Sequence, residues 1–206
     1  MGTARCRAHP GYPAVFHGIG REALRLPGLQ VDAGVEPADA GLARAQTAVS
    51  DLGQSLRAAL KARLEQGGAV DAVDFCHEQA PAIAAAVSAR HGVRVGRAAL
   101  RHRSPGNAPN DWQRALLQDF ASQAAAGAAP ATLRATVRAG LPDGVALRYA
   151  QGIATEPVCL ACHGSTIAAP VAAAIAARYP RDTATGFAEG ELRGMFWAEL
   201  DAAARP

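Results

Sequence analysis

The sequence has 206 residues, half of them hydrophobic and only 5% aromatic, with a formal net charge of +3. This length fits one domain and allows a sizeable core. No basic block interleaved with aromatic residues is present, so we do not expect a nucleic-acid partner. No run of about 18 or more apolar residues is present either, so we expect no membrane span.

Residues 1–36 show no clear structural pattern. Early arginines occur, but no continuous apolar run follows them as in an export signal. Prolines and glycines interrupt the segment at positions 10, 11, 13, 18 and 20. We therefore expect residues 1–36 to be poorly ordered and residues 37–206 to form a single domain. Cys6 lies in the first segment, where we expect a free thiol rather than a lipid-anchored one.

Residues 37–67 predict a long amphipathic helix. Pro37 and Asp39 suit its first turn, and Gly67-Gly68 suits its end. Apolar side chains recur between them at spacings of three and four residues, namely Leu42, Ala45, Val49, Leu52, Leu56, Leu60 and Leu64. We expect this helix to cover the core, and it also offers a surface for a homodimer.

A second helix is predicted from Ala69 to His91, because Gly92 suits its end. One face carries Val73, Cys76, Ala80, Ile83 and Val87. We therefore expect Cys76 to point into the core, either as a small buried hydrophobic residue or as a ligand. Pro81 cannot donate to the carbonyl of His77, so we expect a kink or a restart just after Cys76-His77.

Residues 93–103 predict an extended run, which the turn-rich segment 104–109 follows. Arg97, Arg101 and Arg103 would share one face of this strand, with His102 on the other. This row is either a solvated face or a surface that binds carboxylates. Asn110 or Asp111 then caps a helix up to Gly127, whose inward side chains are Trp112, Leu116, Leu117 and Phe120.

The second half of the sequence predicts a hairpin, a short helix and a last strand. Residues 133–138 and 145–149 alternate apolar and polar side chains around a turn at 141–144. A short alanine-rich helix is expected at about 168–178. Residues 192–200 predict the last strand, in which we expect Met195 and Trp197 to pack. The order of these elements indicates a mixed helical and β fold.

A C-x-x-C-H pentad, Cys159 to His163, follows the hairpin. Covalent attachment of haem c requires this spacing, because two such thiols can add to the two vinyl groups of one porphyrin. His163 would then lie under the iron as the proximal ligand. A structural zinc site would need a fourth ligand, a thioredoxin-type pair has no use for the adjacent histidine, and chance is the third alternative.

A haem needs a second axial ligand and partners for its propionates. Cys76 is the leading candidate for the distal ligand. His77 or His102 would give a bis-histidine haem, Met195 would give an ordinary electron carrier, and an open site is the remaining alternative. Arg97 and Arg101 are the candidates that would hold the propionates.

Four blocks spanning roughly residues 40–200 together resemble a known family: Cys76 to Pro81 (CHEQAP), Gly96 to Trp112, Cys159 to Gly164 (CLACHG) and Tyr179 to Gly194 (YPRDTATGFAEGELRG). This is the bacterial c-type haem domain family, formerly a domain of unknown function, founded on a cyanobacterial haem protein with histidine and cysteine ligands. The resemblance implies an α+β, PAS-like fold with an antiparallel sheet flanked by helices and a long N-terminal helix. It also implies His163 and the Cys76 thiolate as the axial pair, and therefore a low-potential, six-coordinate haem.

The sequence departs from this family in two respects. Family members usually carry a recognisable export signal or an attached transmembrane segment, and this sequence shows neither. The final block also ends in Met195-Phe196-Trp197, where the family usually has lighter side chains.

We expect one covalent haem c in a periplasmic redox or gas sensor, because this attachment takes place outside the bacterial cytoplasm. Reduction, NO or CO would release Cys76, and its helix would move. The alternative is a low-potential periplasmic electron-transfer cytochrome. We do not expect an enzyme, since peroxidase-like chemistry needs an open distal site and only His77 is a nearby acid–base group. The partner is expected to be an unidentified redox or signalling protein.

Overall fold

The computed structural model describes residues 37–202, with side chains from Ala40 onward. The expectations for residues 1–36, including those for Cys6 and for an export signal, lie outside these described residues. None of the described helices is both long enough and apolar enough to cross a bilayer.

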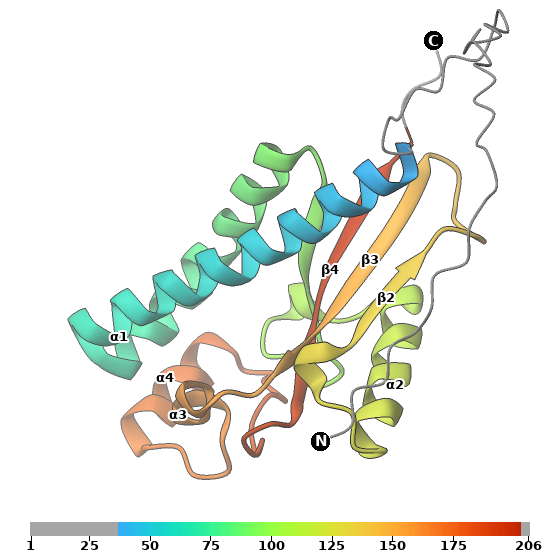
Figure 1. The fold of residues 1–206 in the computed structure, drawn as a ribbon. Helices are drawn as coiled ribbons and strands as arrows, with labels where there is room; N and C mark the ends of the chain where they lie inside the picture. Colours follow the sequence, from blue (N-terminus) through green and yellow to red (C-terminus); the bar gives the residue numbers. More distant parts are fainter. Residues whose placement is uncertain (1–36, 203–206) are drawn as a thin grey trace, which may run out of the picture. The chain divides into compact units, whose positions relative to one another are not determined.

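Four strands form one antiparallel sheet, with helices on either side (Figure 1). The strands are β1 (Arg94–Ala98), β2 (Arg134–Val137), β3 (Val145–Ala154) and β4 (Leu192–Asp201), and their order across the sheet is β1-β4-β3-β2. The helices are α1 (Pro37–His91), α2 (Asp111–Ala125), α3 (Leu160–His163) and α4 (Ala169–Arg178). The expected α+β, PAS-like fold with a long N-terminal helix is confirmed.

α1 consists of two helical halves that meet at Gly68 (Figure 1). Gly68 has φ 76° and ψ −168°, a backbone region that is essentially restricted to glycine. The expected break at Gly67-Gly68 is therefore confirmed. Of the kink or restart expected just after Cys76-His77, the restart is wrong, because Gly68 is the only residue of α1 with non-helical dihedral angles. The kink stays a prediction. Buried Ala80 and Val87 hold the helix against the rest of the domain on both sides of the proline.

The two faces of the sheet carry different cores. Towards α1, the buried cluster contains Ala45, Ala48, Val49, Leu52, Val87, Val93, Val95, Leu147, Tyr149, Ala198 and Leu200. Towards α2, it contains Ala98, Leu117, Phe120, Leu133, Ala150 and Met195. The strand period of two explains this division, because Met195 and Ala198 of β4 have opposite parity. Met195 is fully buried, so its expected packing role is confirmed.

α2 begins as the sequence predicts. The side chain of Asn110 accepts a hydrogen bond from the Gln113 amide at 3.2 Å, and the Gln113 side chain accepts one from the Asn110 amide at 3.1 Å. This capping box satisfies two amides at the start of the helix that have no intrahelical partner. The predicted hairpin is also confirmed as β2 and β3.

The extended run predicted for residues 93–103 is shorter in the structure. β1 ends at Ala98, which pairs with Met195, and the Ala99 amide donates to the Asn107 carbonyl at 3.1 Å. The chain therefore turns into a loop before Arg101. The expectation that Arg97, Arg101 and Arg103 share one strand face is wrong for this reason.

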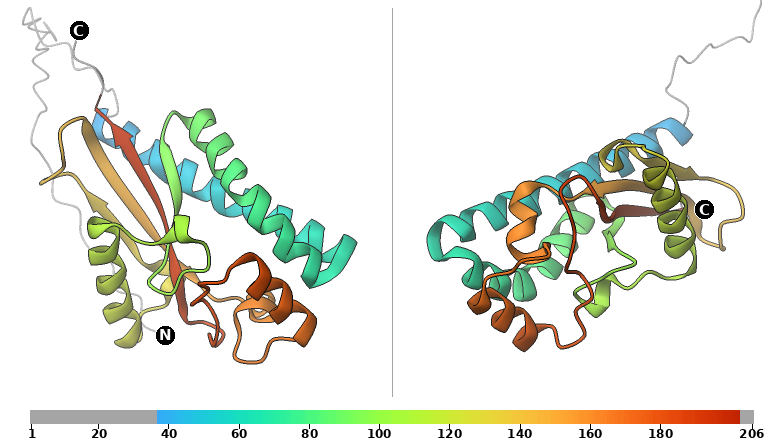
Figure 2. Two further views of the ribbon diagram at one scale, coloured as in Figure 1. Left: turned by 180° about the vertical axis from the view of Figure 1, so that it is seen from behind. Right: turned by 90° about the horizontal axis from the view of Figure 1, so that it is seen from below.

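α3 and α4 lie beside the part of α1 where its two halves meet (Figures 1 and 2). A third buried cluster joins Val73 of α1 to Val171 and Ile175 of α4 and to Tyr179. The Arg178 guanidinium adds an ion pair to Asp74 at 2.7 Å. These contacts fix the segment after β3 against the second half of α1.

Candidate functional site

The C-x-x-C-H pentad lies where the chain leaves the sheet. β3 ends at Ala154, a 3-10 helix covers Pro157–Cys159, and α3 contains the rest of the pentad. The Gly164 amide donates to the Leu160 carbonyl at 2.9 Å. A Cβ added at Gly164 would lie 2.7 Å from that oxygen, so the tight turn after the pentad needs a glycine.

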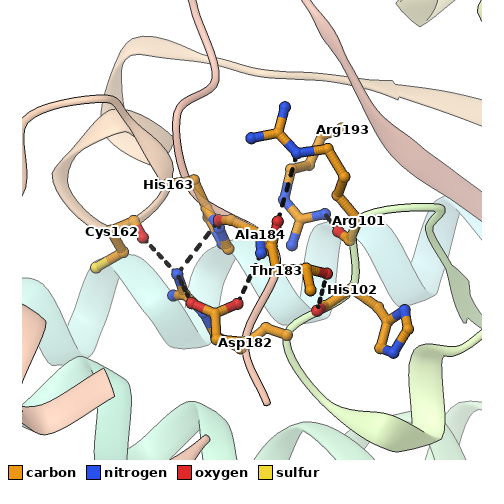
Figure 3. Close-up of polar contacts among 9 residues, drawn as sticks. Arg101, His102, Cys162, His163, Asp182, Thr183, Ala184 and Arg193 are labelled. Atoms are coloured by element: carbon orange, nitrogen blue, oxygen red, sulfur yellow. Dashed lines mark hydrogen bonds and ion pairs between the residues drawn. The ribbon is translucent and has the colours of Figure 1, made fainter. Parts of the chain in front are cut away.

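His163 is held through one of its two ring nitrogens. Its Nδ1 lies 2.6 Å from the carbonyl oxygen of Ala184 (Figure 3). A carbonyl can only accept, so Nδ1 carries the proton and Nε2 keeps a free lone pair. Burial, together with Arg193 and Arg103 nearby, lowers the pKa of His163 to about 3. His163 is therefore a neutral imidazole in the form that ligates metals.

A cavity of about 460 Å³ brings the predicted ligands together. Cys159, Cys162 and His163 line it from the segment that follows β3. Cys76 lines it from the second half of α1. The first half of α1 contributes the apolar side chains Leu52, Leu56, Leu60 and Leu64. The later part of the predicted apolar stripe thus lines the cavity, and Leu52 belongs both to this lining and to the core cluster towards α1. The cavity volume is within the usual range for small-molecule sites.

Two of the cavity thiols, Cys76 and Cys162, lie in an environment that favours the protonated form. The three cysteines of the described residues, Cys76, Cys159 and Cys162, are free and half-buried. Burial raises the pKa of the Cys76 thiol, and Arg97 partly opposes this effect. Burial likewise raises the pKa of Cys162. A stable thiolate at Cys76 would therefore need the additional positive charge that a metal ion supplies.

Arg97, Arg103 and Arg193 line the cavity, whereas Arg101 does not. Arg101 stacks on the Phe187 ring at 4.1 Å from its centroid, and its Nε donates to the Thr183 carbonyl at 3.4 Å. Arg97 forms no hydrogen bond or ion pair with the described residues. Arg193 donates through Nη1 to the Arg101 carbonyl at 3.1 Å. Arg97 is thus the cavity guanidinium fully available to an anionic ligand, and Arg193 can offer its remaining N–H donors.

Sequence reasoning did not identify Arg193. The pairing of β3 with β4 shifts register between Ile153 and Ala154, which pair with Gly194 and Leu192. Arg193 is the additional residue of this β-bulge, and a bulge redirects a side chain relative to the regular alternation. Burial, with Arg103 and Arg97 nearby, lowers the pKa of Arg193 to about 10. The sequence offered only one signal for this residue, which is that an arginine precedes Gly194 at the end of the block Tyr179 to Gly194.

The two alternative histidine ligands also line the cavity. His77 is exposed and packs edge-on against Tyr179, with ring centroids 4.9 Å apart. His102 has a buried Nδ1 without a hydrogen-bond partner among the described residues. Met195 is absent from the lining and belongs to the core beneath α2. The geometry thus leaves Cys76, His77 and His102 as candidates opposite His163.

The residues of this cavity fit a haem. A neutral imidazole and a thiol can supply the axial donors, and four leucines of α1 suit the faces of a porphyrin. The Arg97 guanidinium and the remaining donors of Arg193 suit propionate carboxylates. The unpartnered Nδ1 of His102 is a further polar atom that a bound group could satisfy.

The chain is thus an α+β, PAS-like domain, and its cavity is lined by a C-x-x-C-H segment and by both halves of a broken helix. The model of the Tll0287-like family matches residues 35–200, and the chain belongs to this family. A solved structure, the crystal structure of the cyanobacterial heme-protein Tll0287, is similar to this chain with a TM-score of 0.60 and 26% sequence identity. That similarity covers 84% of this chain and 100% of the other. No curated protein matches the sequence.

Proposed function

We propose that this domain binds one haem c covalently and acts as a periplasmic redox or gas sensor. The observation that carries the proposal is that the pentad and Cys76 line one cavity although they lie far apart in the sequence. The similar cyanobacterial protein is a heme-protein, which supports the same cofactor class here. A periplasmic location follows from the chemistry of covalent attachment.

Six residues that line the cavity have defined parts in this proposal. Cys159 and Cys162 would form the thioether bonds, and Nε2 of His163 would bind the iron on the proximal side. Cys76 would be the distal ligand, and Arg97 and Arg193 would hold the propionates. Bound haem would supply an iron that exchanges one electron and can bind NO or CO.

The position of Cys76 supports sensing. It lies on the half of α1 that follows Gly68, close to Pro81, which removes one hydrogen bond from the helix. If Cys76 leaves the site, this half of α1 loses one of its attachments and can move relative to the first half about Gly68. An unidentified signalling protein, or a second copy of the domain, would detect that movement.

The test compares Cys76→Ala with His77→Ala, a matched variant on the same helix and cavity wall. Both are matured with a c-haem assembly system, and their optical and EPR spectra are recorded. A ferric low-spin thiolate signature that is lost in Cys76→Ala and kept in His77→Ala is the expected result. Identical spectra of Cys76→Ala and the wild type would refute the Cys76 assignment, and absence of covalent haem in the wild type would refute the whole proposal.

A second candidate function is low-potential electron transfer. The observation in its favour is the unbroken helical geometry around Cys76, because a rigidly held ligand suits a carrier that keeps its coordination in both redox states. Reduced-state spectra distinguish the two functions. Retention of the thiolate on reduction and under CO favours the carrier, and its loss favours the sensor.

A further inference from the structure

Arg103 and Asp182 form a buried ion pair beside the backbone segments that hold His163. Arg103 reaches Asp182 through Nε at 3.2 Å and through Nη2 at 3.1 Å. The two side chains are only 10% and 8% exposed. Such buried pairs rarely add stability relative to apolar residues, so the contacts that this pair makes with its surroundings are of interest.

The pair holds both backbone segments that determine the position of His163. Asp182 accepts a hydrogen bond from the Ala184 amide through Oδ1 at 2.8 Å, which places the carbonyl that accepts from His163 (Figure 3). Nη2 of Arg103 donates to the carbonyl of Cys162 at 2.5 Å and lies 3.4 Å from the carbonyl of Ala184. One guanidinium therefore connects the residue before His163 with the hydrogen-bond acceptor of its imidazole.

Neighbouring backbone bonds extend this connection. The Phe187 amide donates to the His163 carbonyl, and the Gly186 amide donates to the Gly164 carbonyl, both at 2.9 Å. On the other side, the Thr183 amide donates to the His102 carbonyl at 3.1 Å. The segment 182–187 is thus held between the loop after β1 and the pentad, with the ion pair between them.

We propose that Arg103 and Asp182 are positioning residues that set the orientation and basicity of His163 as an axial ligand. This inference rests on the proposed function. The hydrogen bond from Nδ1 to a carbonyl makes the imidazole a stronger donor, and such outer partners strongly influence the metal. Arg103 differs in this respect from Arg97, because its guanidinium is already bound to the protein and Arg97 remains available to a ligand.

Charge-conserving variants test the proposal. Arg103→Lys keeps the positive charge, but a lysine is a point donor and cannot reach Cys162, Asp182 and Ala184 at once as the planar guanidinium does. Asp182→Glu keeps the negative charge and displaces the carboxylate. The matched control is Arg148→Lys, which alters a similar buried pair to Glu199, with side chains 13% and 11% exposed, on the face of the sheet towards α2.

The holoproteins are compared by potentiometric titration and by EPR. We expect Arg103→Lys and Asp182→Glu to favour the reduced form by about tenfold, which for a one-electron couple is a rise of about 59 mV. Their low-spin signals broaden because the imidazole plane is less restricted. The control keeps the wild-type potential and spectrum.

The outcomes separate this inference from the proposed function. If Arg103→Lys and Asp182→Glu keep the wild-type potential and line shape, the pair is structural and the inference is wrong. If the control shifts equally, the effect is general loosening, and the inference is again wrong. If the wild type lacks covalent haem or His163 ligation, the proposed function fails first and the inference fails with it.

Discussion

The break in α1 gives a direct test of how the cavity is built. Both halves of the helix line the cavity, and the chain reverses between them at Gly68, where φ is 76° and ψ is −168°. A Cβ added at Gly68 would meet no atom within 4 Å. The substitution Gly68→Ala therefore changes the backbone energy and creates no steric overlap with neighbouring residues.

The expected loss can be worked from these facts. A residue other than glycine in this backbone region costs about 1–3 kcal/mol, and the reduced entropy of the unfolded chain returns about 0.4–1 kcal/mol. The net loss in unfolding free energy is about 1–2 kcal/mol. At roughly 2–4 °C per kcal/mol for a domain of this size, the melting temperature of Gly68→Ala falls by several degrees.

Gly41→Ala is the matched control in the same helix. The added Cβ would lie 3.5 Å from Cδ2 of Leu200, which is ordinary van der Waals contact, and alanine is favoured over glycine inside a helix by about 0.5–1 kcal/mol. We expect Gly41→Ala to raise the stability in urea unfolding and Gly68→Ala to lower it. Equal or higher stability of Gly68→Ala would refute the role given to this glycine.

Two further predictions concern the stability of the domain. His91 and Arg90 donate to the Asp51 carboxylate at 2.8 and 2.6 Å, and this pairing, His91 foremost, lowers the pKa of Asp51 from 3.8. The stabilisation from this pairing is therefore fully present well above pH 3.8. It is lost as the pH falls through the lower pKa that Asp51 has in the folded state. Asp51→Asn should cost about 1 kcal/mol at pH 7 and progressively less below pH 3.8 in urea titrations; a loss independent of pH would contradict this. Gly152→Ala places a Cβ 2.3 Å from the Pro130 carbonyl oxygen and should cost about 2 kcal/mol in the same assay, so an unchanged stability would show that the backbone there can yield.

Local patterns predicted the elements well because their causes are local. The spacing of apolar residues marked both halves of α1, and Gly67-Gly68 marked the break. The end of β1 has a distant cause. After Ala98, the Ala99 amide donates to the Asn107 carbonyl and leaves the strand pairing. On the partner strand, a Cβ at Gly194 would lie 2.6 Å from the Ala98 carbonyl oxygen. This contact joins residues far apart in the sequence, and no window around Ala98 contains it.

The residues of the candidate site, too, were predicted where the cause is local and missed where it is distant. The pentad is a local spacing, and Cys76 followed from a helical face, so both were predicted from the sequence, and both line the cavity. The cationic residues were predicted only in part. Arg101 is diverted by the loop after β1, while Arg193 is redirected by the bulge in β4. Strand parity, the rule used for the arginines, fails where regular strands end.

The distribution of side chains around the cavity restricts what can occupy it. The first half of α1 offers leucines, and β1, the following loop and β4 offer Arg97, Arg103 and Arg193. An apolar wall exposed to water is unfavourable by about 25 cal/mol per Å². The Arg97 guanidinium, which forms no hydrogen bond or ion pair with the described residues, favours an anionic partner. A single occupant that satisfies both walls has broad apolar faces and carboxylates at its edge, and a central metal ion would meet Nε2 of His163. These are the properties of haem, so the walls of the cavity and its ligands point to the same cofactor independently.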